Sequence, residues 1–83
     1  MDEQNPPITI AELARERGLF LHDLGPRATI CLYNNGYRLP GPKGLRRMSE
    51  RLQIPPQQLM DVCRAAVARR QAQQLAQQLE ASA

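Results

Sequence analysis

The sequence predicts an all-α protein, and three observations lead to this prediction. Apolar residues recur at helical spacing in successive segments bounded by N-cap residues, glycines or prolines. No segment alternates apolar and polar residues as a half-buried strand does. After the Pro55-Pro56 pair, the chain continues to its end without glycine or proline, which is typical of one long helix.

The first helix is expected within "PPITIAELARERG". Thr9 has the character of an N-cap residue, and Glu12 stands three residues later, which is the spacing of a capping box. Ile10, Leu13 and Ala14 share one face of this helix. Gly18 then ends it, because glycine readily adopts the left-handed conformation that follows a helix.

Two elements are expected in the next 18 residues. "LFLHDLG" indicates a short apolar turn, ended by Gly25 and Pro26. "PRATICLYNN" predicts a helix with Pro26 in its first turn, where the missing N–H costs nothing. Gly36 is the predicted left-handed stop.

The last two helices follow. "LPGPKGLRRMSERLQI" carries Leu45, Met48, Leu52 and Ile54 at helical spacing, and Pro42 precedes or opens its helix. The final helix has one stripe suited to packing against the domain, which consists of Leu59, Val62, Cys63 and Ala66.

A second stripe of the final helix advances by alternating steps of three and four residues, as in a coiled-coil seam. Its members are Ala65, Ala68, Ala72, Leu75 and Leu79. We expect it to form a homodimer, the alternative being a solvated terminal helix that folds over its own domain. The expected organisation is an N-terminal arm (1–8), a folded domain (9–66) and a C-terminal helix extension (67–83).

Charge is distributed unevenly along these 83 residues. Residues 1–26 hold two arginines against five carboxylates, whereas the remainder holds nine basic side chains against three acidic ones. A basic C-terminal part suits a polyanionic partner, although a solvated basic surface would look the same. No apolar run is long enough to span a bilayer and no signal peptide is apparent, so we expect no membrane association and a cytoplasmic location.

Signals for catalysis and for cofactors are absent from the sequence. It contains no P-loop, no nucleophile elbow and no HExxH motif, and we therefore expect no enzyme and no catalytic residues. The two cysteines, Cys31 and Cys63, lie far apart and only His22 could join them in a metal site, so we expect no metal and no cofactor. We expect both thiols to be reduced, a regulatory disulfide being the alternative.

Residues 10–62 resemble the Cro/C1-type helix-turn-helix family, also called XRE or lambda-repressor-like. "IAELARERGLFLHDLG" resembles its first helix and the start of its second. "RATICLYNNGYRLP" resembles the recognition helix and its exit, and "LRRMSERLQIPPQQLM" resembles the fourth helix and the start of the fifth. The resemblance implies a compact five-helix domain, here with an extended C-terminal helix.

One departure from the family concerns the second helix. Leu24 is followed at once by Gly25-Pro26, about one turn earlier than in the family. Either the second helix is shortened, or "IAELARERGL" takes its place and the linker is enlarged. We prefer the shortened helix, because the alternative would run proline through the next helix at a cost of ~3 kcal/mol.

The helix over residues 27–35 is the expected DNA-reading element. Ile30 and Tyr33 mark its inward face, and its opposite face is the one that a major groove would receive. The expected base contacts are Arg27, Ala28, Cys31, Leu32 and Asn35. Arg27 suits guanine and Asn35 suits adenine, since each can form a bidentate pair, while Ala28 or Leu32 can touch a thymine methyl.

Contacts to the DNA backbone are expected from neighbouring residues, which fix register without reading sequence. These are Thr29, Asn34, Tyr37, Arg38 and Lys43. An alternative for Asn34 and Asn35 is that they only end the helix.

The resulting hypothesis is a sequence-specific, double-stranded-DNA-binding transcriptional regulator. The resemblance implies a dimeric repressor that occludes a promoter at a palindromic operator, and the protein would be nucleoid-associated when bound. Two alternatives stay open. One is an antitoxin of a toxin–antitoxin pair with the same DNA-binding fold. The other is a protein-interaction module without DNA binding, whose partner would use the C-terminal helix.

Overall fold

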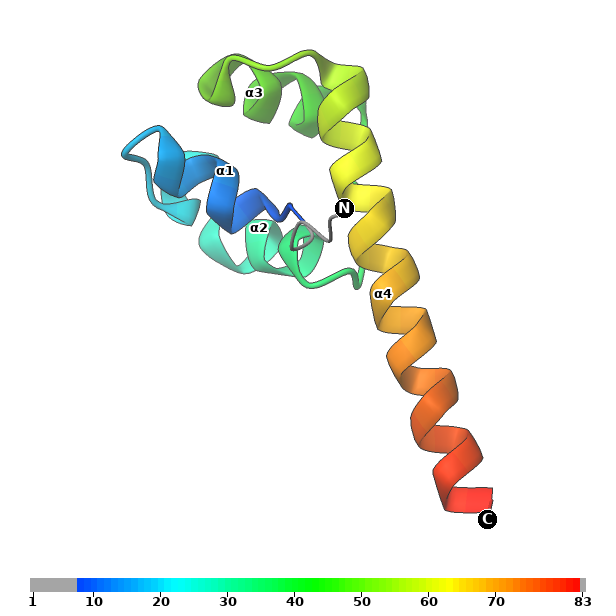
Figure 1. Cartoon of the computed structure of the whole chain (residues 1–83). Helices are drawn as coiled ribbons and strands as arrows, with labels where there is room; N and C mark the ends of the chain where they lie inside the picture. Colours follow the sequence, from blue (N-terminus) through cyan, green and yellow to red (C-terminus); the bar gives the residue numbers. More distant parts are fainter. Residues whose placement is uncertain (1–7, 83) are drawn as a thin grey trace, which may run out of the picture.

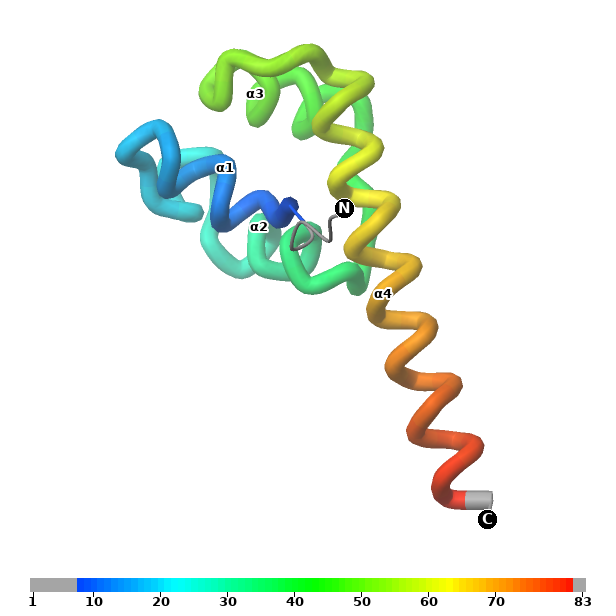
Figure 2. Tube along the Cα trace, in the orientation of Figure 1, coloured from blue at the N-terminus to red at the C-terminus, as the bar shows by residue number. Residues whose placement is uncertain are grey.

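A computed structural model describes residues 8–82, which form four α-helices and one short 3-10 helix, with no strand in this range (Figures 1 and 2). The α-helices are α1 (Ile10–Glu16), α2 (Arg27–Asn34), α3 (Pro42–Leu52) and α4 (Pro56–Ser82). The 3-10 helix, η1 (Leu21–Asp23), lies between α1 and α2. The predicted all-α class is confirmed, whereas the predicted count of five helices is wrong.

The count differs because the segment between α1 and α2 forms only the single turn η1. The Asp23 carboxylate accepts a hydrogen bond from the Phe20 backbone N–H at 2.8 Å, which closes this turn locally. Gly25 follows with φ +157°, and Pro26 then serves as the N-cap of α2 rather than as a residue of its first turn. Proline cannot continue a preceding helix, so the chain has no room for a further turn here.

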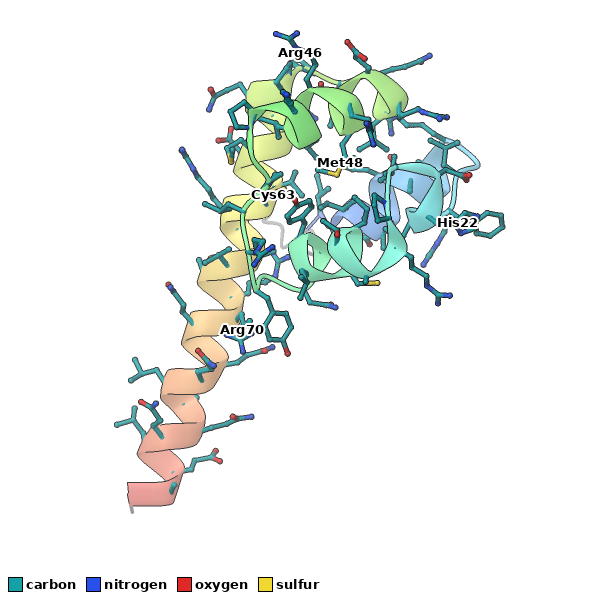
Figure 3. All side chains as sticks on the ribbon, turned by 180° about the vertical axis from the view of Figure 1, so that it is seen from behind. His22, Arg46, Met48, Cys63 and Arg70 are labelled. Atoms are coloured by element: carbon teal, nitrogen blue, oxygen red, sulfur yellow. The ribbon has the colours of Figure 1, made fainter. Side chains whose placement is uncertain are left out.

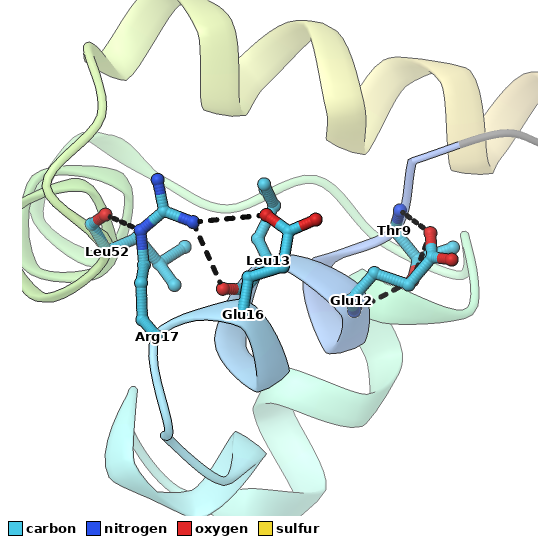
Figure 4. Close-up of polar contacts among 6 residues, drawn as sticks. All are labelled: Thr9, Glu12, Leu13, Glu16, Arg17 and Leu52. Atoms are coloured by element: carbon cyan, nitrogen blue, oxygen red, sulfur yellow. Dashed lines mark hydrogen bonds and ion pairs between the residues drawn. The ribbon is translucent and has the colours of Figure 1, made fainter. Parts of the chain in front are cut away.

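The start of α1 is fixed by the predicted capping box. The Thr9 hydroxyl accepts from the Glu12 N–H, and the Glu12 carboxylate accepts from the Thr9 N–H, both at 3.1 Å. At the other end, Arg17 donates from Nε to the Leu52 carbonyl and from Nη1 to the Leu13 carbonyl (Figure 4). One guanidinium therefore satisfies carbonyls at the C-terminal ends of both α1 and α3.

The end of α2 is a Schellman motif that brings the chain against α4. The Tyr37 N–H donates to the Leu32 carbonyl at 2.9 Å, and the Gly36 N–H donates to the Tyr33 carbonyl at 3.3 Å. Gly36 has φ +81°, as predicted for a left-handed stop. A Cβ on Gly36 would lie 2.3 Å from the carbonyl oxygen of Ala66, so only glycine allows this approach.

The core gathers one face from each helix. α4 contributes the predicted packing stripe, and Leu24 of the linker is also buried. The buried apolar residues are Ile10, Leu13, Ala14, Leu24, Ile30, Met48, Leu52, Leu59, Val62, Cys63 and Ala66. Leu45, Ile54 and Tyr33 are half-buried against this cluster. The apolar periodicity therefore identified the core-facing side of all four α-helices.

The elements are arranged around α1. α2 and α3 lie on opposite sides of α1, and α4 runs past one end of all three (Figure 1). The last buried residue is Ala66, and every residue from 71 to 81 is exposed. This exposed part of α4 projects beyond α2, and we call it the tail (Figure 2). Of the predicted arm at 1–8, only Ile8 lies within the described residues, and it is exposed. None of the described helices is both long and apolar enough to cross a membrane.

Candidate nucleic-acid interface

Three contacts fix the orientation of α2. Ile30 is only 3% exposed, and Tyr33 is half-buried beside it against the core. The Asn34 side-chain oxygen accepts a hydrogen bond from the Ala11 N–H at 3.0 Å, which caps the first turn of α1. These contacts hold one side of α2 inward and leave the other side to solvent.

The free side of α2 carries the residues predicted to contact bases. Arg27, Ala28, Leu32 and Asn35 are exposed, Leu32 being 36% exposed, and Cys31 is half-buried among them. We call these five residues the outer face of α2. Thr29, predicted to contact the DNA backbone, is half-buried at the side of the helix. Asn34 uses its amide oxygen within the fold, so only its NH₂ group is left for an outside contact.

The N-terminal end of α2 adjoins an aromatic pair. The rings of Phe20 and His22 stack with centroids 5.4 Å apart, and both residues are exposed. Together with Leu21 and Arg27 they line a surface hollow of about 340 Å³. His22, which Figure 3 shows at the outer edge of the domain, also lies 3.8 Å from the Asp23 carboxylate.

The turn after α2 is joined to α4 by a cation–π contact. The Arg70 guanidinium lies 3.8 Å from the centroid of the Tyr37 ring (Figure 3). Tyr37 is 59% exposed and Arg38 is exposed next to it. Two of the five residues predicted to contact the DNA backbone, Tyr37 and Arg38, therefore stand in a turn that is held by its backbone bonds and by Arg70.

Three basic residues of α3, Lys43, Arg46 and Arg47, share one face of the helix and line a surface hollow of about 320 Å³ together with Pro42 and Glu50. Lys43 stands in the first turn of α3, and it is the neighbouring Gly44 that faces the inward side of α2, since the Tyr33 hydroxyl would lie 3.9 Å from a Cβ on Gly44. Arg46 and Arg47 are both exposed, and Arg46 points away from α2 (Figure 3). Lys43, predicted to contact the DNA backbone, therefore lies with Arg46 and Arg47, and the structure does not bring it beside the outer face of α2.

A polar groove lies between the end of α2 and α4, and the sequence analysis did not predict it. Its larger hollow measures about 370 Å³ and is lined by Asn35, Tyr37, Arg70, Gln73, Gln74 and Gln77. An adjoining hollow of about 240 Å³ shares three of these residues and adds Arg69 and Asn34, among others. We call the two hollows the α4 groove. A sequence signal existed: the buried stripe of α4 continues as Arg70, Gln73 and Gln77 at steps of three and four residues.

The predicted dimer stripe lies on the other side of α4. Successive residues of a helix are rotated by about 100°, so this stripe is centred roughly 150° from the buried stripe. All its members are exposed, including Leu75 at 57% and Leu79 at 63%; they are Ala65, Ala68, Ala72, Leu75 and Leu79. The helix thus carries a core face that continues into the α4 groove, and an apolar stripe at the back.

Both thiols of the protein lie in the described part of the chain. Both cysteines are free. Burial raises the pKa of the Cys63 thiol to about 11, because the thiolate is poorly solvated in the core. Residues 8–82 contain no group of three or more histidine, cysteine or carboxylate side chains that could hold a metal ion.

Comparisons with protein-family models, with curated proteins and with solved structures each find no match. Any function must therefore be argued from the chain's own residues and geometry.

Proposed function

We propose that this protein is a sequence-specific, double-stranded-DNA-binding transcriptional regulator that inserts α2 into the major groove. The observation that carries the proposal is the outer face of α2. An α-helix held on its opposite side by Ile30 and Asn34 offers a continuous exposed surface, with an arginine at one end and an asparagine at the other. One helix of this size fits the major groove of B-DNA.

The chemistry of the outer face supports this function. Arg27 and Asn35 can form bidentate pairs with guanine and adenine, and the methyl groups of Leu32 suit a thymine methyl. Tyr37 and Arg38, in the turn after α2, supply a hydroxyl and a cation for phosphates nearby. Such a division between reading and positioning residues is expected of a Cro/C1-type helix-turn-helix, which the sequence resembles, with η1 standing for a shortened second helix.

The back of α4 supports a homodimer. Leucines that are more than half exposed at coiled-coil spacing bury apolar area only when a second helix covers them. Two heptads are short, so we expect a concentration-dependent dimer. A dimer would bind an inverted repeat and repress by occluding the promoter that contains it.

Selection of binding sites from random duplexes tests the function directly. We expect a palindromic consensus and an affinity whose logarithm falls linearly with the logarithm of salt concentration. Arg38→Ala should lower that slope by about one, whereas Arg27→Ala should relax preference at one base pair. Equal loss of affinity for specific and random DNA in Arg27→Ala would remove this residue from base reading.

Cys31 offers an intrinsic probe of the same surface. Because it lies half-exposed on the outer face of α2, a specific duplex should protect it from alkylation by iodoacetamide. Cys63 is buried and serves as an unreactive internal reference. Unchanged labelling of Cys31 at saturating duplex would contradict insertion of α2 into DNA.

The exposed leucines of the tail also favour a second candidate, a protein partner on α4. An antitoxin would mask a toxin with this helix while binding DNA through α2, and an interaction module would bind the partner alone. Affinity for duplex DNA separates the interaction module, which would have none, from the transcriptional regulator and the antitoxin. A toxin gene next to this one would favour the antitoxin.

A further inference from the structure

We infer that the α4 groove is a second DNA-contacting site, which binds the phosphate backbone of the same duplex that receives α2. The inference rests on the proposed function and extends it to residues of α4. It assigns the contact to Arg70, with support from Gln73 and Gln77. The predicted dimer stripe on the other side of α4 stays available to another protein chain.

The first argument is the chemistry of the groove lining. The larger hollow is walled by one guanidinium, four side-chain amides and a phenol, and its neighbour adds a second guanidinium, Arg69. Neither hollow includes an aspartate or glutamate among its described lining residues. A groove rich in N–H donors and free of carboxylates suits a polyanion, and phosphate oxygens are acceptors only.

The second argument is position. Asn35 belongs both to the outer face of α2 and to the groove lining, so the two surfaces are continuous. The tail projects past the end of α2 on this side (Figure 1). Arg70 and Gln77 are about 10 Å apart along the helix axis, which matches the rise of roughly three base pairs. A duplex lying against α2 would therefore have one strand beside the tail.

The third argument is preorganisation of Arg70. Its guanidinium carbon lies over the Tyr37 ring, 3.8 Å from the ring centroid, so the ring holds the cation in one place. The N–H donors lie along the edges of a guanidinium, so they stay free to bond phosphate oxygens. A cation that is already oriented loses less side-chain entropy when it binds.

Salt-dependent binding of matched variants to one selected duplex tests the inference. Arg70→Ala should lower the slope of log K against log salt by about one and weaken binding ~8-fold at 0.1 M salt. Arg64→Ala removes the same charge from the same helix, but Arg64 is exposed outside the groove, and its slope should stay at the wild-type value. Arg70→Lys, which keeps the charge, should retain the slope.

Arg70→Ala also removes the contact with Tyr37 and could loosen the turn after α2. A second pair of variants leaves this contact intact. Gln77→Glu places a carboxylate in the groove and should weaken binding, whereas Gln71→Glu outside it should not. Circular-dichroism melts should be alike for all five variants.

The outcomes separate this inference from the proposed function. If the wild type binds the duplex and Arg27→Ala relaxes its sequence preference, but Arg70→Ala and Gln77→Glu bind like their controls, the groove contact is refuted alone. If the wild type binds no duplex, both proposals fall. Weakening in Arg70→Ala and Gln77→Glu, with unchanged controls, would establish the contact.

Discussion

The two halves of α4 belong to one uninterrupted helix, yet they obey different constraints. In the first half, Leu59, Cys63 and Ala66 are buried and their identities are explained by the core. In the tail, residues 71–81 are all exposed, and the fold gives no reason for leucines at positions 75 and 79. The difference teaches that core packing sets the sequence of the first half, whereas packing within the chain does not account for the leucines of the tail.

The largest effect should come from a cavity in the buried half. Leu59 is fully buried, and Leu59→Ala should lower the free energy of unfolding by about 2–5 kcal/mol. Chemical denaturation measures this loss. Leu75→Ala is the matched control, since the same change in the exposed half should cost far less in the monomer. Similar losses at both positions would show that the tail packs against something in the isolated chain.

The next effect should come from the junction between α2 and α4. Gly36→Ala forces a Cβ against the Ala66 carbonyl and places alanine in a left-handed conformation, at a combined cost on the order of 3 kcal/mol. Gly18→Ala is the control, because Gly18 also has positive φ but no atom within 4 Å of its added Cβ. It should therefore cost only ~1–2 kcal/mol. Equal melting temperatures for the two variants would contradict the close approach of α2 to α4.

The stability of the wild type should depend on pH through Cys63, which lies in the buried half of α4. The pKa of Cys63 is raised to about 11 from an ordinary value of 9.0, so the folded chain keeps its proton after the unfolded chain has lost it. The contribution of the Cys63 thiol to the free energy of unfolding is thus fully present below pH 9, and it is lost as the pH rises from 9 to 11. The loss should approach 2–3 kcal/mol at pH 11. Denaturation of wild type and Cys63→Ala across this range isolates the effect, and a parallel decline in both would contradict it.

The smallest effect on stability should come from the tail, where the largest effect on assembly is expected. Leu75→Ala combined with Leu79→Ala should change the monomer's free energy of unfolding by less than about 0.5 kcal/mol per site. Sedimentation equilibrium should nevertheless show loss of the dimer. A wild-type chain that stays monomeric at millimolar concentration would remove the dimer from the proposal.

Local patterns made much of the fold predictable. The capping box at Thr9 and Glu12 and the left-handed stop at Gly36 depend on residues close in sequence, and the structure confirms them. The buried stripe of α4 follows from helical periodicity alone. The short apolar turn predicted for "LFLHDLG" is present as η1, whereas the helix count was wrong, because Asp23, Gly25 and Pro26 together decide over only a few residues whether a second α-helix can form.

The unpredicted contacts join residues that are distant in sequence. Arg17 bonds the Leu52 carbonyl, Asn34 caps α1, and Arg70 stacks on Tyr37, and no spacing rule connects these pairs. For the candidate site, the exposure of the outer face of α2 followed from its periodicity, whereas the α4 groove required knowing how α4 crosses the end of α2. The roles of these residues in DNA binding stay predictions.

The contact between Gly36 and the backbone of Ala66 has a mechanical consequence. Because Gly36 has no side chain, the end of α2 lies directly against the backbone of α4, and the tail extends from this contact as a lever arm. A load applied near Leu79 would exert torque where α2 ends. Should α2 enter DNA as we propose, a partner bound at the far end of α4 would act on the orientation of α2 through this contact.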